Sequence, residues 1–154
     1  MKRTATILAT VALMVTLSSG VALAAYEDSI TGTDHTDILS GTGKAEHILG
    51  LGGGDQLYGG GGADLVEGSL GSDELGDGLG RDTLKGGAGA DNMIGQGGDT
   101  SVDHFYGGSG RDRVQPKDVP AVRDFIDCGP GIDYRVYADK ADVVADNCEL
   151  VSTR

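Results

Sequence analysis

The chain has 154 residues, of which 28 are glycine, and 24 acidic side chains against 12 basic ones give a formal net charge of −12. Glycine is far above its usual share of roughly 7%, but no strict Gly-X-Y triplet occurs, so a collagen triple helix is excluded. The acidity argues against DNA, RNA or an anionic membrane as partners and favours cations, while 5% aromatic residues are too few for a thick apolar core.

The N-terminus has the features of a secretory signal peptide. Met1-Lys2-Arg3 is basic, residues 7–17 (ILATVALMVTL) are apolar, and Ala22-Leu23-Ala24 is a small-residue cleavage site. An apolar run of this length is short of the roughly 20 residues that a membrane span needs. We therefore predict a signal peptide at 1–24 and a secreted mature chain. Its 24 acidic and 10 remaining basic residues give a formal charge of −14.

Acidic residues recur every nine positions through most of the mature chain. Two steps of twelve, each a nonapeptide with three extra residues, interrupt the series before Asp103 and before Asp124. The acids in this register are Asp28, Asp37, Glu46, Asp55, Asp64, Asp73, Asp82, Asp91, Asp103, Asp112, Asp124, Asp133 and Asp142. Such a fixed period is the signature of a repeat architecture, in which each unit packs on its neighbours.

An apolar residue stands two positions after almost every acid, and glycines fill the positions before it. The apolar row is Ile30, Leu39, Ile48, Leu57, Val66, Leu75, Leu84, Met93, Phe105, Val114, Ile126 and Val144, and Arg135 alone breaks it. The glycine segments include Gly59-Gly60-Gly61-Gly62 and Gly86-Gly87-Ala88-Gly89.

Each nonapeptide is predicted to form a glycine turn followed by a short strand of three residues, whose middle residue faces inward. Two nonapeptides make one flattened coil, and successive coils stack about 4.8 Å apart. The expected fold is all-β, a parallel β-roll, or right-handed β-solenoid. Acids that are two nonapeptides apart then form a ladder along each edge of the roll.

Stacked carboxylates repel one another unless a cation or a proton neutralises them. Calcium fits best, because it takes six to eight oxygen ligands and tolerates mixed shells of carboxylate and carbonyl oxygens. Magnesium prefers water-rich octahedral sites, and the three histidines show no zinc-ligand spacing. We therefore predict several bound Ca²⁺ ions, roughly five to seven if neighbouring coils share ligands.

The pattern resembles the G-G-x-G-x-D-x-U-x nonapeptide of RTX, or haemolysin-type, calcium-binding repeats. The best matches are 59–67, 77–85, 86–94 and 107–115. The resemblance implies that each calcium lies between the turns of neighbouring coils, bound by turn aspartates and by carbonyls of the glycine segment. The implied side-chain ligands are Asp37, Asp55, Asp64, Asp73, Asp82, Asp91, Asp103 and Asp112. The implied carbonyl ligands lie in the glycine segments and include Gly59, Gly61, Gly86 and Ala88.

The glycine density falls after residue 116. We expect the calcium-binding roll at 25–116 and a capping segment with divergent repeats at 117–154, since a solenoid needs an atypical terminal unit. Cys128 and Cys148 are predicted to form a disulfide in this cap, because an exported chain meets an oxidising environment. The CGPG…CE ending resembles those of secreted bacterial calcium-repeat proteins.

We found no nucleophile elbow, zinc-protease helix or P-loop, so we do not expect an enzyme. The expected function is calcium binding by a secreted β-roll that folds on binding calcium and acts as a structural or adhesive extracellular module. Two alternatives stay open: a calcium-gated accessory chain that stabilises an exported enzyme, and a simple calcium buffer. Expected partners are calcium ions and an extracellular protein or cell surface, with no nucleic acid and no membrane span after signal cleavage.

Overall fold

The computed structural model describes residues 28–96, 98, 100–117, 122–133 and 135–153, so the predicted signal peptide lies outside the described residues. The described part of the chain contains no helix long and apolar enough to cross a membrane. Its strands fall into two sheets. Sheet A contains β1 (Asp28–Thr31), β3 (Glu46–Gly53), β5 (Leu65–Gly71), β7 (Thr83–Gly89), β9 (His104–Gly110), β11 (Phe125–Asp127) and β13 (Val143–Val144). Sheet B contains β2 (Ile38–Ser40), β4 (Gln56–Gly61), β6 (Glu74–Leu79), β8 (Asn92–Ile94), β10 (Arg113–Gln115), β12 (Arg135–Ala138) and β14 (Val151–Thr153).

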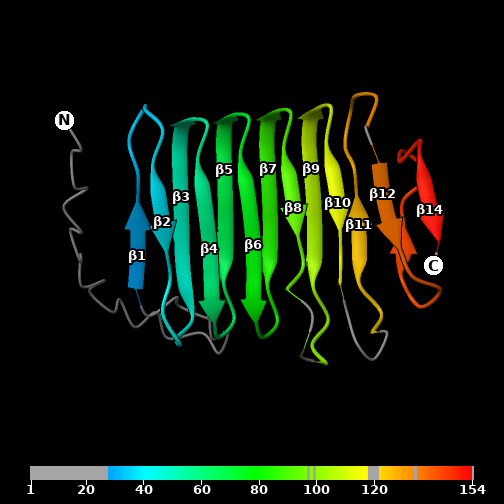
Figure 1. Ribbon diagram of the computed structural model, residues 1–154, viewed down its shortest axis with the longest axis horizontal. Coiled ribbons are helices and arrows are strands. Elements are labelled where there is room, and N and C mark those ends of the chain that lie inside the picture. The colour runs from blue at the N-terminus through cyan, green and yellow to red at the C-terminus, as the bar shows by residue number, and fades with distance from the viewer. Residues whose placement is uncertain (1–27, 97, 99, 118–121, 134, 154) are drawn as a thin grey trace, which may run out of the picture.

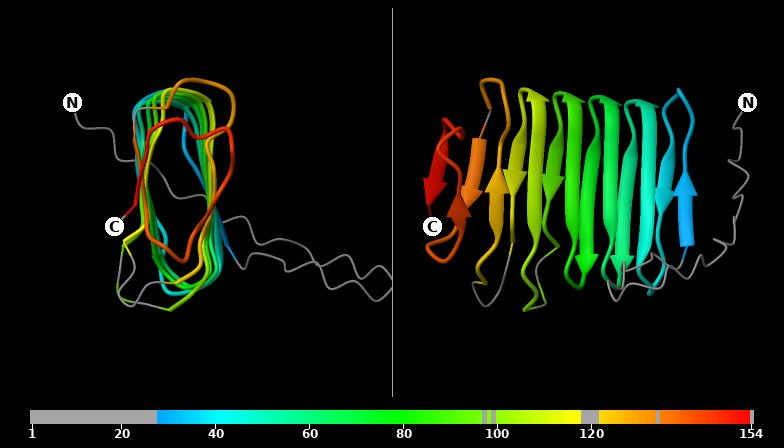
Figure 2. Two further views of the ribbon diagram at one scale, coloured as in Figure 1. Left: turned by 90° about the vertical axis from the view of Figure 1, so that its right-hand side faces the viewer. Right: turned by 180° about the vertical axis from the view of Figure 1, so that it is seen from behind.

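The chain winds as a β-solenoid in which successive strands alternate between the two sheets. Each seven-stranded sheet holds its strands in chain order, and the paired strands run parallel. The two sheets face each other along the length of the roll (Figure 1), and the end-on view shows a flattened coil with two long sides and two narrow edges (Figure 2). The predicted all-β parallel roll is therefore confirmed.

The strand register follows the predicted coil length. Ile48 pairs with Val66 and Val66 with Leu84, so that each coil consists of two nonapeptides. Beyond β7 the coil is longer, and Leu84 pairs with Phe105 because three extra residues intervene. These residues lie between β8 and β9, outside the strands, so they leave the alignment of the next coil intact.

The interior is one thin row of apolar side chains between the sheets. The predicted residues from Leu39 to Ile126 are buried, while Ile30 and Val144 at the two ends are partly buried. The break expected at Arg135 is wrong. Val114 pairs with Val136, which is fully buried, and Arg135 lies outside beside Arg113. One extra residue after Asp133 thus shifts the inward position from 135 to 136.

The strands are longer than the predicted three residues at many positions. In β3 the ladder continues from Leu49 into the glycine segment, where Leu51 pairs with Ser69 and Gly53 with Gly71. Glycines at positive φ, such as Gly53 at 135° and Gly71 at 133°, let these segments pair while they bend around the edge. The glycine segments are therefore part of the sheets as well as turns.

The predicted disulfide is present near the C-terminus, where Cys128 and Cys148 are joined with their Cα atoms 5.2 Å apart. Both sheets continue through the segment expected to be the cap, since β11 to β14 extend them. The boundary at residue 116 stays a prediction.

Candidate metal sites

The acids of the nonapeptide register form two hydrogen-bonded ladders, one where the strands of each sheet begin. On the edge that precedes sheet B, the backbone N–H of Asp37 donates to Oδ1 of Asp55 at 2.8 Å, and the N–H of Asp55 donates to Oδ1 of Asp73 at 2.8 Å. The same bond recurs from Asp73 to Asp91, Asp91 to Asp112 and Asp112 to Asp133, at 2.9 to 3.1 Å.

The opposite edge repeats this arrangement before the strands of sheet A. The N–H of Glu46 donates to Oδ1 of Asp64 and that of Asp64 to Oδ1 of Asp82, both at 2.8 Å. The ladder runs on through Asp103, Asp124 and Asp142. Each carboxylate thus has one oxygen fixed by the preceding coil, which sets the direction of its second oxygen.

The second carboxylate oxygen, Oδ2, is buried and accepts no hydrogen bond in six of the eight predicted ligands. They are Asp55, Asp64, Asp73, Asp82, Asp91 and Asp112, each at most 2% exposed. A buried charged oxygen without a partner is strongly disfavoured. A cation at this oxygen would satisfy it.

A glycine five residues before the aspartate leaves room beside such an oxygen. A Cβ on Gly50 would lie 2.6 Å from Oδ2 of Asp55 and 2.8 Å from the carbonyl oxygen of Gly68 in the next coil. A Cβ on Gly86 would lie 2.5 Å both from Oδ2 of Asp91 and from the carbonyl oxygen of Gly107. The missing side chain therefore opens a space that a carboxylate oxygen and a carbonyl oxygen both border, which is the mixed oxygen donor set that calcium accepts.

Burial changes the acidity of these carboxyl groups. Desolvation is the largest cause and raises the pKa of Asp82 to about 8, of Asp91 to about 7 and of Asp64 to about 6. The backbone N–H bond to each carboxylate opposes this rise, and neighbouring acids add to it. Without a metal ion Asp82 therefore holds its proton at neutral pH, whereas Asp64 releases its proton at a lower pH.

The first two acids of the ladders differ from the others. Oδ2 of Asp37 accepts the N–H of Thr33 at 2.7 Å and its hydroxyl at 2.8 Å. Glu46 is fully buried and its carboxylate accepts the N–H and the hydroxyl of Thr42. In these two units a threonine therefore donates hydrogen bonds to the carboxylate, whereas in later coils one carboxylate oxygen has no hydrogen-bond partner.

The other predicted ligands occupy equivalent places. Asp103 lies in the second ladder, where its Oδ1 accepts the N–H of Asp82. Gly59 and Gly86 lie beside Asp64 and Asp91 respectively, whereas Gly61 and Ala88 belong to the paired part of β4 and β7.

Besides Glu46, three buried acids of the described residues were not among the predicted ligands. Asp124 and Asp133 continue the ladders into the C-terminal coils, and the nine-residue register was the signal that could have identified them. Oδ2 of Asp133 is likewise buried and accepts no hydrogen bond. Asp77 stands where other coils have the glycine five residues before the aspartate, here Asp82. Its Oδ1 accepts the N–H of Gln96 at 2.6 Å, at the start of the loop that carries the three extra residues. No periodic signal in the sequence pointed to Asp77.

Within the described residues, no group of three or more His, Cys, Asp or Glu side chains could hold a metal ion by itself. Any ion bound at the ladders would therefore draw most of its ligands from backbone carbonyls. This fits calcium, which binds carbonyl oxygens readily, better than zinc, which requires nitrogen or sulfur side chains.

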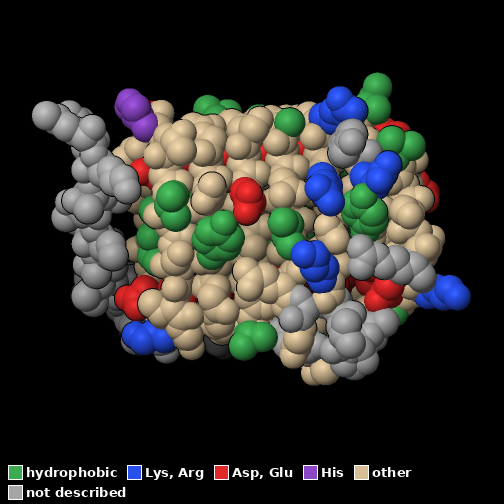
Figure 3. Space-filling model, viewed as in Figure 1, with side chains coloured by type: hydrophobic (Ala, Val, Ile, Leu, Met, Phe, Trp, Pro, Cys, Tyr) green, Lys and Arg blue, Asp and Glu red, His purple; other side chains and the backbone are tan. Residues whose placement is uncertain are grey.

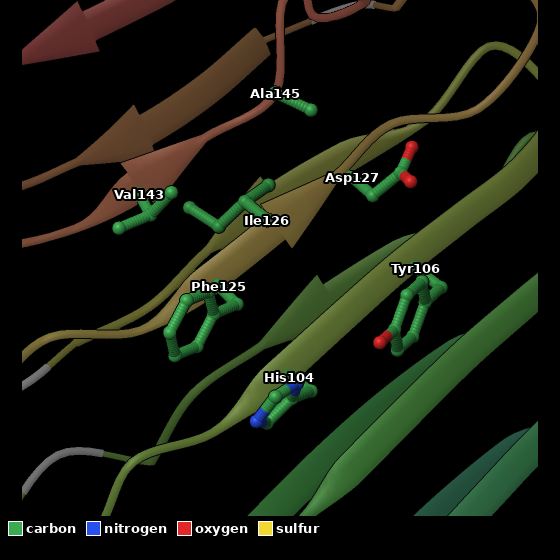
Figure 4. A pocket seen from close by; sticks show the side chains of 7 residues that line it. All are labelled: His104, Tyr106, Phe125, Ile126, Asp127, Val143 and Ala145. Carbon is green, nitrogen blue, oxygen red and sulfur yellow. The ribbon is translucent and has the colours of Figure 1, made fainter.

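A separate shallow pocket of about 280 Å³ lies on the outer face of sheet A (Figure 4). His104 and Phe125 stack on neighbouring strands with ring centroids 4.9 Å apart, and Tyr106 lies beside His104. The pocket is mainly apolar and contains none of the predicted ligands.

The comparison with known families agrees with the geometry. The family model for the RTX calcium-binding nonapeptide repeat matches residues 40–75 and 77–102, in four copies. Curated proteins and solved structures yielded no match to the chain. The matched residues include five of the six predicted ligands whose Oδ2 is buried without a hydrogen bond. The coils between residues 40 and 102 are therefore RTX calcium-binding nonapeptide repeats, and such repeats bind calcium.

Proposed function

We propose that this chain is a secreted calcium-binding β-roll that folds when calcium binds and acts as a structural or adhesive extracellular module rather than as an enzyme. The observation that carries the proposal is the unpartnered Oδ2 beside a glycine in successive coils. Among the predicted ligands, Asp55, Asp73, Asp91 and Asp112 supply this oxygen in successive coils on one edge, and Asp64 and Asp82 supply it on the other, so ions would bind in a row along each edge.

The side-chain ligands we assign are the six predicted aspartates with that oxygen, together with Asp103. Their Oδ1 atoms are held by backbone N–H groups, so the carboxylates are oriented before an ion arrives. Carbonyls of the glycine segments, among them Gly68 and Gly107, supply further oxygens. The threonine bonds at Asp37 and Glu46 make the first coil the weakest calcium site.

Dependence of folding on calcium follows from the burial of so many carboxylates around a thin apolar core. In the folded chain without calcium, these groups must be protonated or remain charged in a buried place. A ligand that binds only the folded state stabilises it by about 2.7 kcal/mol per site at a hundred times its dissociation constant. Several sites together would therefore move the chain from disordered to folded.

The test is far-UV circular dichroism of the mature chain, residues 25–154, titrated with calcium and in parallel with magnesium. A cooperative change from coil to β-structure with calcium alone supports the proposal. A spectrum that is already β-rich in chelator at pH 8 and does not respond to calcium would overturn the folding claim. Isothermal titration calorimetry on the same samples would then show whether ions still bind.

A further inference from the structure

Most of the protein's excess negative charge lies inside the roll. Among the described residues, eleven acidic side chains are buried: Glu46, Asp55, Asp64, Asp73, Asp77, Asp82, Asp91, Asp103, Asp112, Asp124 and Asp133. The other ten described acids are Asp28, Asp34, Asp37, Glu67, Glu74, Asp127, Asp139, Asp142, Asp146 and Glu149. They are balanced by nine described cations, Lys44, Arg81, Lys85, Arg111, Arg113, Lys117, Arg123, Arg135 and Lys140. With the interior neutralised by calcium, the described surface is nearly neutral.

Four of these cations form a basic patch on the C-terminal coils, which we define as Arg111, Arg113, Lys117 and Arg135. Arg113 begins β10 and Arg135 begins β12, its neighbour in sheet B, while Arg111 and Lys117 lie two residues before and after β10. Figure 3 shows Lys and Arg side chains gathered at this end of the roll, where Figure 1 places β10 and β12, and few over the N-terminal coils. A chain with a net negative charge therefore has a positively charged surface region on its C-terminal coils.

Two arginines of the patch are held side by side. Arg113 and Arg135 occupy paired positions on adjacent parallel strands, where like charges oppose each other. Both guanidinium groups lie over the ring of Tyr137, 5.4 and 5.5 Å from its centroid, and Arg135 donates a 2.9 Å hydrogen bond to the Tyr137 hydroxyl. The Arg113 Nε is buried without a hydrogen-bond partner. An anionic group between the two guanidinium groups would relieve their repulsion.

Three described acids, Asp112, Asp133 and Glu149, lie close to these strands in the sequence or in the structure. Glu149 lines a surface hollow together with Arg135, and its Oε2 already accepts the backbone N–H of Asp133 at 3.0 Å. Asp112 and Asp133, which precede the two strands, are buried in the ladder and do not reach the outer face. Each of these three acids thus accepts a hydrogen bond from the backbone of a neighbouring coil.

We propose that the basic patch binds an anionic polysaccharide, whose carboxylate or sulfate groups are held by Arg113 and Arg135. This inference rests on the proposed function, because the surface becomes neutral only when calcium fills the interior. Guanidinium groups form paired hydrogen bonds with carboxylate and sulfate groups, which a lysine cannot do. Arg111 and Lys117 are six residues apart and flank β10, a separation of up to about 20 Å in extended chain, so the patch is elongated as a linear polymer requires.

The same geometry is less suited to nucleic acid and to membranes. Single-stranded nucleic acid is bound by stacking bases on exposed aromatic rings. Tyr137, the aromatic residue beside Arg113 and Arg135, has both guanidinium groups over its ring. Membrane-surface binding by one sheet face would need apolar side chains that enter the lipid. The four patch residues are cationic, and the exposed Leu150 and Val151 that line the same hollow as Arg135 are too few to form an apolar face.

The experiment uses the calcium-loaded mature chain and three immobilised probes: heparin, polygalacturonate and neutral dextran. We expect salt-sensitive binding to the two anionic polymers and none to dextran. The double variant Arg113→Gln/Arg135→Gln should bind at least tenfold more weakly. The control Lys44→Gln/Lys85→Gln removes two cations outside the patch. Its affinity for the anionic polymers should stay within about twofold of that of the original chain, because the location of the charge matters more than the net charge. Arg113→Lys/Arg135→Lys keeps the charge and should still lose several-fold, because the paired hydrogen bonds are gone.

Equal losses in the Gln double variant and its control would overturn the proposal, as would binding to neither anionic polymer. Tighter binding to single-stranded DNA or to phosphatidylglycerol vesicles, lost with Arg113 and Arg135, would assign the patch to a different partner class and also overturn it. Circular dichroism with calcium is recorded on every sample. A normal calcium response without polymer binding contradicts this inference alone, whereas an absent calcium response contradicts the proposed function.

Discussion

The backbone N–H of Asp73 donates a 2.9 Å hydrogen bond to Oδ1 of Asp91 in the next coil, while Oδ2 of Asp91 is buried without a partner. One carboxylate therefore joins two coils and still presents an oxygen for a cation. The structural role and the proposed metal-binding role fall on different atoms of the same side chain, so substitutions can separate them.

The space beside Asp91 depends on Gly86. In Gly86→Ala the new Cβ would lie 2.5 Å from Oδ2 of Asp91 and from the Gly107 carbonyl oxygen. We expect a loss of about 1–3 kcal/mol in stability with calcium present and weaker calcium binding. Urea denaturation and calorimetry measure the two effects. Gly43→Ala is the matched control, because nothing lies within 4 Å of its Cβ, and it should change stability by less than about 0.5 kcal/mol. Equal effects of the two substitutions would contradict the assigned site.

The raised pKa values of Asp64, Asp82 and Asp91 make the calcium-free roll sensitive to pH. Each folded-state pKa lies above the ordinary value of 3.8, at about 6, 8 and 7 respectively. The folded state therefore holds protons that the unfolded chain releases, and the stability they contribute is full below pH 3.8 and is lost as pH rises through 6 to 8. We expect calcium-free protein to show more β-structure at pH 5 than at pH 8.5. Calcium affinity should change in the opposite direction, since ions compete with these protons. A calcium-free fold that strengthens with rising pH would contradict this account.

Asp82→Asn tests whether charge or hydrogen bonding matters at the most perturbed carboxylate. The amide keeps an oxygen that can accept the N–H of Asp64 but loses the buried charge. In chelator at pH 8.5 the variant should be more stable than the original chain, and in calcium its affinity should fall by tenfold or more, about 1.4 kcal/mol. Thermal melts and calorimetry give both values. Asp34→Asn, at an exposed acid, should show neither change.

The disulfide closes a loop of 20 residues in the C-terminal coils. Cys128→Ser/Cys148→Ser should lower stability by about 3 kcal/mol, mainly because the unfolded chain regains freedom. Urea denaturation in saturating calcium measures the loss. Calcium binding by the coils before residue 95 should persist, because their ladders form without either cysteine. Loss of all calcium binding would show instead that these coils need the closed end.

Val136 and Arg135 distinguish the observed register from the one that the nonapeptide count alone predicts. Val136→Ala should cost roughly 2 kcal/mol, because the side chain is fully buried in the apolar row. Arg135→Gln should have a small effect on stability, since the side chain is exposed. Denaturation midpoints of the two variants decide between the registers, and the opposite order would place position 135 inside.

The nine-residue period was sufficient to predict the coil length, the buried apolar row and the stacking of acids. These features depend on the backbone pairing between coils, which is the same whatever side chains the outer face carries. It failed at Val136, where a single inserted residue shifts the phase. It also failed for Asp77, whose role depends on the enlarged coil beside it and not on the repeat. The hydrogen bonds from each N–H to Oδ1 could not be predicted, since they depend on how two coils pack. The net charge of the sequence likewise gave no sign that eleven acids of the described residues are buried.

Because successive strands alternate between two sheets, only some insertions or deletions of nonapeptides keep the later side chains on their original face. Gain or loss of two nonapeptides adds or removes a whole coil and leaves later side chains on their original face, as the pairing of Val66 with Leu84 illustrates. A change of one nonapeptide would move every later strand to the other sheet, so Arg113 and Arg135 would exchange faces with His104 and Phe125. Duplications that preserve the surface must therefore occur in pairs of nonapeptides.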